Sequence, residues 1–192
     1  VDNGAKEITL LGQNVNAFNY EGKKLSDLLF EISKIEDLKR IRYTTSHPLD
    51  FSKDLIQAHK NFKKLMPLIH LPVQSGSNKI LKSMGRNHSV EDYILIINEL
   101  KKANPLIKFS SDFIIGYPGE TDKDFEETLR LLEQVSFINS YSYIYSPRPG
   151  TPAATMKKVD FTAAKNRLLI FQKTAEKIKM KYRKRLFNKI SS

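Results

Sequence analysis

Polar side chains and glycines cluster in segments that follow apolar, strand-like stretches of this sequence. Gln74, Ser75, Gly76 and Ser77 lie between such a stretch and the start of a helix-like segment. Backbone amides at a helix start, together with the positive end of the helix dipole, can hold a carboxylate or a phosphate. The same four residues could equally form an ordinary capping loop, with Ser77 as the N-cap residue.

Asp112 is an acidic residue in a stretch that is otherwise as apolar as Phe109 and residues 113–115. Because an unpaired carboxylate is costly to bury, we expect Asp112 to face the interior of the fold and bind a ligand. A structural hydrogen bond to a neighbouring loop is an equally good explanation. Gly116 and Tyr117 then begin a tight turn, which ends at Glu120.

Several other kinds of chemistry lack support. The four histidines are His47, His59, His70 and His88, and none is spaced like a metal ligand pair. His47 and His88 fall in loops and could touch a ligand, whereas we expect structural or surface roles for His59 and His70. No P-loop, Gly-x-Gly-x-x-Gly segment or Ser/His/Asp pattern supports nucleotide-triphosphate or hydrolytic chemistry. With no cysteine, the chain cannot by itself ligate a thiolate-bound metal or an iron-sulfur cluster.

Strand-like and helix-like segments alternate, which predicts βα units around a parallel sheet. We expect strands at residues 7–11, 40–45, 68–71, 109–115 and 138–145, and helices at 25–32, 51–59, 78–83, 89–103 and 121–132. A last helix lies within residues 157–192, with an apolar seam of Ala164, Leu168, Phe171, Ala175, Ile178 and Tyr182. About five such units are too few for a closed barrel, so the predicted fold class is α/β with an open or partial barrel. Loops after parallel strands meet at one rim, where we expect Gln13, Asn14, Asn16, Ser46, His47, Gln74, Ser75, Ser77, Asp112, Gly116, Glu120, Ser146 and Arg148.

The composition is that of one ordinary globular domain, with 192 residues of which 40% are hydrophobic. The net charge of +11 is uneven, because residues 157–192 hold twelve Lys and Arg against two acidic residues. This basic C-terminal helix could bind a polyanion, or it could simply be a solvated helix face. No apolar run is long enough to span a bilayer, so we expect a cytoplasmic protein without membrane contact.

Six segments together resemble a known family. They are GQNVNAF (12–18), RIRYTTSHP (40–48), HLPVQSGS (70–77), MGRNH (84–88), SSDFIIGYPGET (110–121) and YSYIYSPRPGTPAA (141–154). In this order the segments resemble the radical-SAM methylthiotransferases, in particular the tRNA enzymes that add a 2-methylthio group to N6-isopentenyladenosine beside the anticodon. Asn14-Val15-Asn16 favours this tRNA branch over the branch that modifies a ribosomal protein.

The resemblance implies S-adenosylmethionine (SAM) and 4Fe-4S clusters as cofactors and tRNA as partner. It implies that the SAM carboxylate or ribose lies near Gln74, Ser75, Gly76 and Ser77. The adenine would lie near Gly116 and Tyr117, with further polar contacts at Asn14, Asp112 and Arg148.

The family pattern also has parts that we do not expect in this chain. By resemblance, such enzymes carry an N-terminal cluster domain, a cysteine-bearing loop after the first barrel strand, and a small C-terminal RNA-binding domain of the TRAM type. We therefore expect residues 1–156 to be a partial radical-SAM barrel, with residues 157–192 as a basic helix packed on it in the same domain. We expect this chain to be a truncated or split product, inactive alone unless a separate polypeptide supplies the cysteines.

Other functions stay open at this stage. The chain could be a non-catalytic RNA-binding remnant that uses its basic helix, or a methylthiotransferase for another tRNA base or for a ribosomal protein. An unrelated phosphate-binding barrel enzyme is disfavoured, because no loop after a strand carries a convincing acid/base pair.

Overall fold

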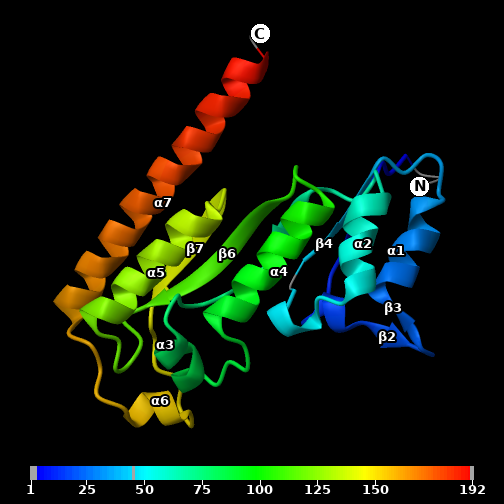
Figure 1. Ribbon diagram of the computed structural model, residues 1–192. Helices are drawn as coiled ribbons and strands as arrows, with labels where there is room; N and C mark the ends of the chain where they lie inside the picture. The colour runs from blue at the N-terminus through cyan, green and yellow to red at the C-terminus, as the bar shows by residue number, and fades with distance from the viewer. Residues whose placement is uncertain (1–3, 45, 191–192) are drawn as a thin grey trace. The chain divides into compact units, whose positions relative to one another are not determined.

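Pairs of parallel strands, each followed by a helix, organise the chain (Figure 1). The computed structural model describes residues 4–44 and 46–190. These residues form two compact units, each with its own core: unit 1 comprises the described residues of 1–72 and 92–108, and unit 2 comprises those of 73–91 and 109–192. The two units are described separately below. Among the described residues, no helix has the length and apolar character that a bilayer span requires.

Unit 1 is built on strand β1, which pairs in parallel with β4 so that Ile8 lies opposite Ile41. Helices α1 and α2 pack against each other, and the buried residues of this unit include Leu29, Ile41 and Leu55. The elements are β1 (Glu7–Leu10), β2 (Asn19–Tyr20), β3 (Lys23–Lys24), α1 (Leu25–Ser33), β4 (Arg40–Tyr43), α2 (Lys53–Asn61), β5 (Leu68–His70) and most of α4 (Val90–Ala103).

Unit 2 is built on β6, which pairs in parallel with β7 so that Asp112 lies opposite Tyr141 and Ile114 opposite Tyr143. Alternate residues of β6 point to opposite faces. On one face, Phe113 contacts the rings of Phe137 and Phe171 at centroid distances of 5.5 and 4.7 Å. The elements are α3 (Asn78–Ser83), β6 (Lys108–Ile115), α5 (Asp122–Val135), β7 (Asn139–Ile144), α6 (Pro152–Thr155) and α7 (Phe161–Ile190).

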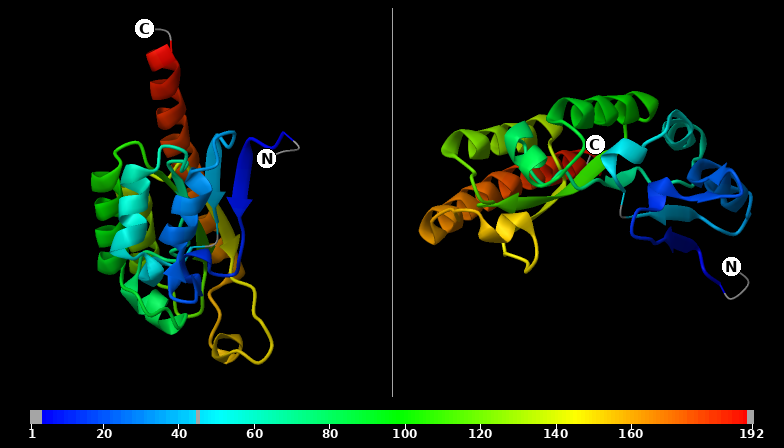
Figure 2. Two further views of the ribbon diagram at one scale, coloured as in Figure 1. Left: turned by 90° about the vertical axis from the view of Figure 1, so that its right-hand side faces the viewer. Right: turned by 90° about the horizontal axis from the view of Figure 1, so that it is seen from below.

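Helix α7 packs on β7 and α5 along its N-terminal half, and its C-terminal turns extend beyond both (Figures 1 and 2). Asp160 begins the helix, because its side chain accepts a hydrogen bond from the Ala163 amide at 2.9 Å. The predicted apolar seam is confirmed: Ala164 and Phe171 are buried, and Leu168, Ala175, Ile178 and Tyr182 are half-buried.

The expected strands and helices are present, with ends that differ by a few residues. Thr45, placed at the end of a predicted strand, lies outside the described residues. The short β2–β3 hairpin and helix α6 were not predicted, because segments of two to four residues carry too little periodicity. The proposed division into a barrel segment and a packed basic helix stays a prediction.

One buried polar pair lies in the core of unit 1. The Tyr43 hydroxyl lies 2.6 Å from His59 Nε2, and the His59 side chain is buried, which agrees with the structural role expected for it. Burial lowers the pKa of His59 to about 4, because the charged imidazolium would lose its hydration. Burial likewise raises the pKa of Tyr43. The pair is therefore neutral at neutral pH.

This burial makes stability depend on pH. Because the pKa of His59 is lower in the folded state than its ordinary value of 6.5, the unfolded chain binds a proton first as the pH falls. We expect the free energy of unfolding to drop by about 3 kcal/mol between pH 6.5 and pH 4. Urea unfolding at a series of pH values measures this. His59→Gln should flatten that part of the profile, and His47→Gln, at a more exposed site, should retain it; equal profiles for the two variants would refute the assignment.

Candidate functional site

A cavity of about 690 Å³ lies in unit 2 against the C-terminal halves of β6 and β7, where its lining includes Asp112, Ile114 and Tyr143. It contains four of the nine residues that the sequence predicts as cofactor contacts: Gln74, Asp112, Tyr117 and Arg148. The rest of its lining comes from β6, from the end of α3 and the residues after it, from β7 and the loop that follows it, and from the start of α6. It comprises Ser83, Met84, Gly85, Arg86, Ile114, Tyr143, Ile144, Tyr145, Ser146, Thr151, Pro152 and Ala153. The lining combines aromatic walls with a few polar groups, as small-molecule sites do.

Gln74 and Asp112 form the strand side of the cavity. The backbone amide of Gln74 donates to the backbone carbonyl of Asp112 at 3.0 Å. The backbone carbonyl of Gln74 accepts from the backbone amide of Ile114 at 2.9 Å. Gln74 has a φ of 77°, which is a strained conformation for any residue but glycine and costs on the order of 1 kcal/mol. The backbone bonds on both sides hold Gln74 in this conformation, next to the half-buried Asp112.

Tyr117 forms the opposite wall. Its hydroxyl donates to the carbonyl oxygen of Ser83 at 2.9 Å, and its ring meets Tyr145 edge-on with 5.1 Å between centroids. Gly116 precedes it with a φ of 72°, and a Cβ there would lie 2.7 Å from the Ala164 Cβ of α7. Only glycine therefore lets this turn pass so close to α7, although Gly116 itself is outside the cavity lining.

Glu120 and Arg167 fix the turn that carries Tyr117. The Glu120 carboxylate accepts from the Gly116 amide at 3.1 Å and from Arg167 at 2.8 Å. Burial raises the pKa of Glu120, while the Gly116 amide and Arg167 oppose that rise. The sequence predicts Glu120 at the rim, but it indicates nothing for Arg167 beyond membership of the basic C-terminal helix. Nothing in the sequence pairs two residues so far apart.

Ser75, Gly76 and Ser77 are buried and bond to helix α5. The Gly76 amide donates to Thr128 Oγ1 at 3.0 Å, and the Ser77 amide donates to Ser75 Oγ at 3.2 Å. The backbone amides of Gly76 and Ser77, which could hold an anion, are therefore already hydrogen-bonded inside unit 2. Ser77 is the N-cap residue of α3, but its hydroxyl donates to Asp124 at 2.7 Å rather than to the helix. Direct contact of these three residues with a cofactor stays a prediction.

Asp124 gathers the polar contacts at the start of α5. Besides the bond from Ser77, its carboxylate accepts hydrogen bonds from Lys79 Nζ and from the Thr121 backbone amide, both at 2.8 Å. Burial alone would raise the pKa of Asp124, but these hydrogen bonds outweigh it and hold the pKa well below its usual range. Thr121 is the N-cap residue of α5 in a capping box with Asp124, which confirms the predicted cap.

Asn14, the ninth predicted contact, belongs to unit 1. Its amide donates to Asp50 Oδ2 at 2.5 Å. Its neighbour Asn16 donates to the His47 carbonyl and accepts from the His47 amide, both at 2.8 Å. The loops that follow β1 and β4 therefore lie side by side, as expected for parallel strands, but contact between Asn14 and a cofactor stays a prediction.

Comparison with known proteins identifies the family. Residues 1–132 match the family model described as "Radical SAM superfamily". The chain belongs to the radical SAM superfamily. Members of the superfamily use SAM and a 4Fe-4S cluster. Because this chain has no cysteine, its residues do not fit such a cluster, and no group of three or more His, Asp or Glu among the described residues could hold a metal ion.

Curated relatives are similar along almost the whole of this radical SAM chain. The tRNA-2-methylthio-N(6)-dimethylallyladenosine synthase of Pelagibacter ubique is 58% identical, over 99% of this chain and 44% of that protein. The proteins of the same name from Wolbachia pipientis (subsp. Culex pipiens) and Neorickettsia sennetsu are 53% and 50% identical. The chain thus spans less than half the length of the relatives it matches.

Solved radical SAM structures confirm the fold class. Coproporphyrinogen III oxidase of Escherichia coli matches with a TM-score of 0.68 at 14% identity, over 90% of this chain and 40% of that chain. The Elp3 protein of Methanocaldococcus infernus matches with a TM-score of 0.61 at 19% identity, over 86% of this chain and 44% of that chain. The α/β fold with a partial barrel, predicted from the sequence, is the fold of this superfamily.

Gly76 allows a direct test of how the cavity is held. A Cβ at Gly76 would lie 2.5 Å from Thr128 Cα and 2.6 Å from the Glu127 carbonyl oxygen, so the loop or α5 must move. We expect Gly76→Ala to lower the free energy of unfolding by roughly 3 kcal/mol, measured by urea denaturation. Gly85→Ala is the matched control: it meets no atom within 4 Å and should cost only about 1 kcal/mol, from its positive φ. If Gly76→Ala and Gly85→Ala lowered the free energy of unfolding equally, the 74–77 loop could shift away from α5 at no cost, and the constraint inferred at Gly76 would be refuted.

Proposed function

We propose that this chain provides the SAM-binding part of a radical SAM tRNA methylthiotransferase. The substrate class is tRNA that carries an N6-dimethylallyl adenosine, the nucleoside in the names of its curated relatives. One observation carries the proposal: four of the nine residues that the family resemblance assigns to SAM, Gln74, Asp112, Tyr117 and Arg148, are distant in sequence but line a single cavity. A tRNA substrate also places the protein in the cytoplasm.

The cavity suits the functional groups of SAM. SAM carries a cationic sulfonium and an ammonium, a carboxylate, and an adenine ring. The Asp112 carboxylate can attract the cationic end of SAM. The side-chain amide of Gln74 can hydrogen-bond the ribose or the carboxylate. Tyr117 and Tyr145 offer aromatic surface to the adenine, and Arg148 can pair with the carboxylate. Ser75, Gly76 and Ser77 support Gln74 through their bonds to α5, and a direct contact to SAM is part of the proposal for them as well.

Bound SAM supplies the radical chemistry of the superfamily only together with a reducing cluster. Because the chain has no cysteine, the thiolate ligands of that cluster have to come from a polypeptide segment outside these 192 residues. We propose that this chain alone binds SAM but does not turn over, and that a cysteine-bearing partner completes the site. The contribution of this chain is then to bind and orient SAM.

Equilibrium dialysis with SAM tests this assignment. We expect the chain to bind SAM, and Asp112→Asn to weaken binding about tenfold, because a charge-assisted contact is worth at least about 1.4 kcal/mol. Asp37→Asn, at an exposed site in unit 1, is the matched control and should bind as the wild type does. The proposal is wrong if Asp112→Asn has no effect, or if a sugar phosphate displaces SAM at similar concentration, which would instead favour a phosphate-binding barrel enzyme.

A further inference from the structure

The segment MGRNH (84–88) has no role in the SAM site proposed above, although part of it enters the same cavity. Met84, Gly85 and Arg86 belong to the cavity lining, and Arg86 is half-buried. An arginine carries a planar fork of N–H donors and no acceptor, so in a cavity it calls for an anion or an acceptor group of a ligand.

The end of helix α3 fixes the position of Arg86. The backbone amide of Gly85 donates to the Lys82 carbonyl at 3.0 Å, and the backbone amide of Arg86 donates to the Leu81 carbonyl at 2.9 Å. These two bonds form the Schellman motif that ends many helices. Gly85 has a φ of 71°, the left-handed conformation that the motif needs. Backbone hydrogen bonds therefore place Arg86 at the cavity.

The same helix end is tied to the cavity wall that is assigned to the adenine of SAM. The Tyr117 hydroxyl donates to the carbonyl oxygen of Ser83, the last residue of α3, at 2.9 Å. Met84 packs against the buried cluster that contains Tyr117. A ligand held by Arg86 would therefore lie beside SAM, in the same cavity.

Positive charge exceeds negative charge in this cavity. Its charged lining residues are Arg86, Arg148 and Asp112. Neither arginine forms an ion pair with a residue that the structure describes. SAM itself has two positive groups and one carboxylate. If Arg148 pairs with that carboxylate and Asp112 attracts the cationic end, Arg86 is left beside a cationic ligand without an anion, which is unfavourable in a partly buried site.

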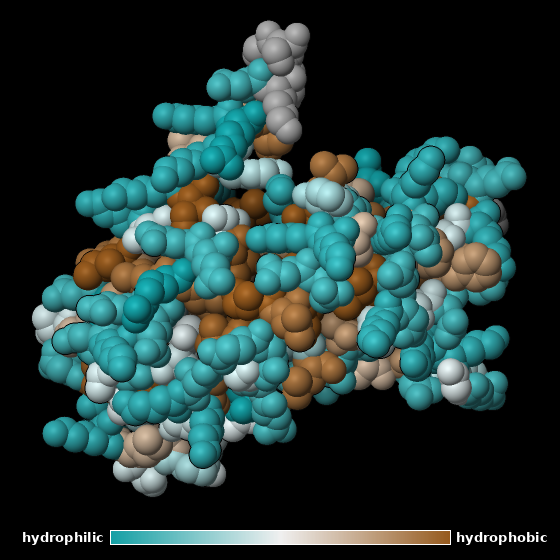
Figure 3. All heavy atoms as spheres, in the orientation of Figure 1, coloured by the Kyte–Doolittle hydropathy of each residue, from teal (hydrophilic) through white to brown (hydrophobic). Residues whose placement is uncertain are grey.

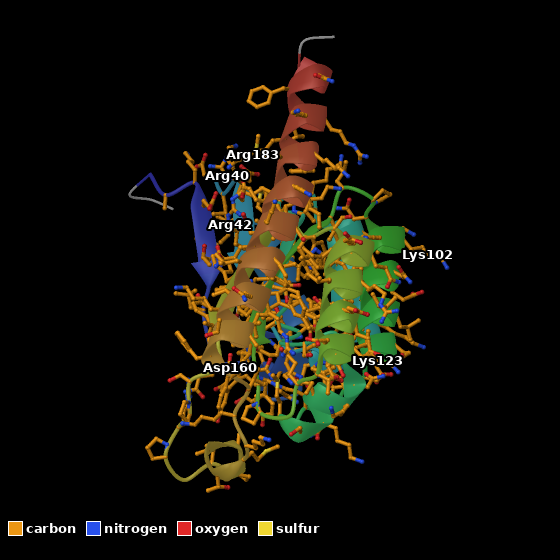
Figure 4. The ribbon with its side chains drawn as sticks, turned by 90° about the vertical axis from the view of Figure 1, so that its left-hand side faces the viewer. Arg40, Arg42, Lys102, Lys123, Asp160 and Arg183 are labelled. Carbon is orange, nitrogen blue, oxygen red and sulfur yellow. The ribbon has the colours of Figure 1, made fainter. Side chains whose placement is uncertain are left out.

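Other cations of unit 2 lie in different surroundings. Lys123 of α5 and Arg183 of α7, both labelled in Figure 4, are exposed and lie outside the cavity lining. Hydrophilic side chains also extend from α7 on the face shown in Figure 3. Arg167 is largely buried, but Glu120 and Asp122 each accept from it at 2.8 Å. Arg86 differs from these cations because it is half-buried in the cavity and has no acidic partner in the described chain.

We propose that Arg86 binds a phosphate group of the substrate nucleotide and holds it in the cavity beside SAM. Arginine pairs with phosphate through two parallel N–H···O bonds, which a hydroxyl or an amide cannot match. The inference rests on the proposed function, because a nucleotide substrate brings such a phosphate next to the nucleoside that is modified. It makes Arg86 the residue by which the cavity distinguishes a nucleotide from a free nucleoside.

Equilibrium dialysis with saturating SAM tests this role of Arg86. The probe is the 5′-monophosphate of N6-dimethylallyl adenosine, compared with the same nucleoside without phosphate. We expect the monophosphate to bind about tenfold more tightly, because its contact with arginine is charge-assisted. Arg86→Gln should abolish this preference and leave binding of the nucleoside unchanged. Equal affinity of the wild type for the monophosphate and the nucleoside would overturn the proposal.

Arg183→Gln is the matched control, because it removes the same side chain from an exposed position outside the cavity lining. It should bind the monophosphate as the wild type does, whereas equal losses in Arg183→Gln and Arg86→Gln would reduce the effect to general charge attraction and refute the proposal. Inorganic phosphate is a second source of the same chemistry. It should displace the monophosphate only at a much higher concentration, and equal potency would make Arg86 a site for free phosphate instead.

SAM binding separates the failure of this inference from the failure of the proposed function. Arg86→Gln should still bind SAM, which also shows that the variant is folded. If the wild type does not bind SAM, the proposed function is wrong, and the comparison of monophosphate with nucleoside, repeated without SAM, still decides the role of Arg86. If Arg86→Gln loses SAM but keeps its preference for the monophosphate, Arg86 holds the SAM carboxylate and the phosphate proposal is wrong.

Discussion

The close approach of the 74–77 loop to helix α5 is the constraint on which the cavity of unit 2 depends. Gly76 lies so near the backbone of α5 that no side chain fits between them, and its amide bonds to Thr128. Ser77 reaches Asp124 in the same helix, so the loop is held at two points. This anchoring places Gln74 in a strained conformation beside β6, where its side chain lines the cavity with Asp112.

A second set of contacts holds the other wall. Arg167 of α7 binds Glu120, which in turn binds the Gly116 amide, so the turn carrying Tyr117 is tied to the last helix. Gly116 and Gly76 are constrained in the same way, because at each of them a loop passes so close to a helix that a Cβ atom would clash with it. The helix is α7 at Gly116 and α5 at Gly76. The helices of unit 2 thus position the cavity residues without lining most of the cavity themselves.

The sequence predicts those features that depend on local chemistry. The Thr121 cap, the apolar seam of α7 and the strand carrying Asp112 follow from residue type and spacing, and the structure has all three. It also predicts that Gln74, Asp112, Tyr117 and Arg148 act together, through their place in an ordered set of family segments. In the structure these four residues line one cavity, and their contact with a cofactor stays a prediction.

Features that depend on contacts across the chain could not be predicted in this way. Ser77 has the residue type and position of an N-cap, yet its hydroxyl bonds to Asp124, which lies 47 residues away. Arg167 looks like any other cation of a basic helix until the fold places it on Glu120.

The most direct test of the central claim is a crystal structure of this chain grown with SAM. The account predicts SAM in the cavity of unit 2, with its cationic end at Asp112 and its adenine near Tyr117. A structure with an empty cavity and SAM bound elsewhere would contradict it.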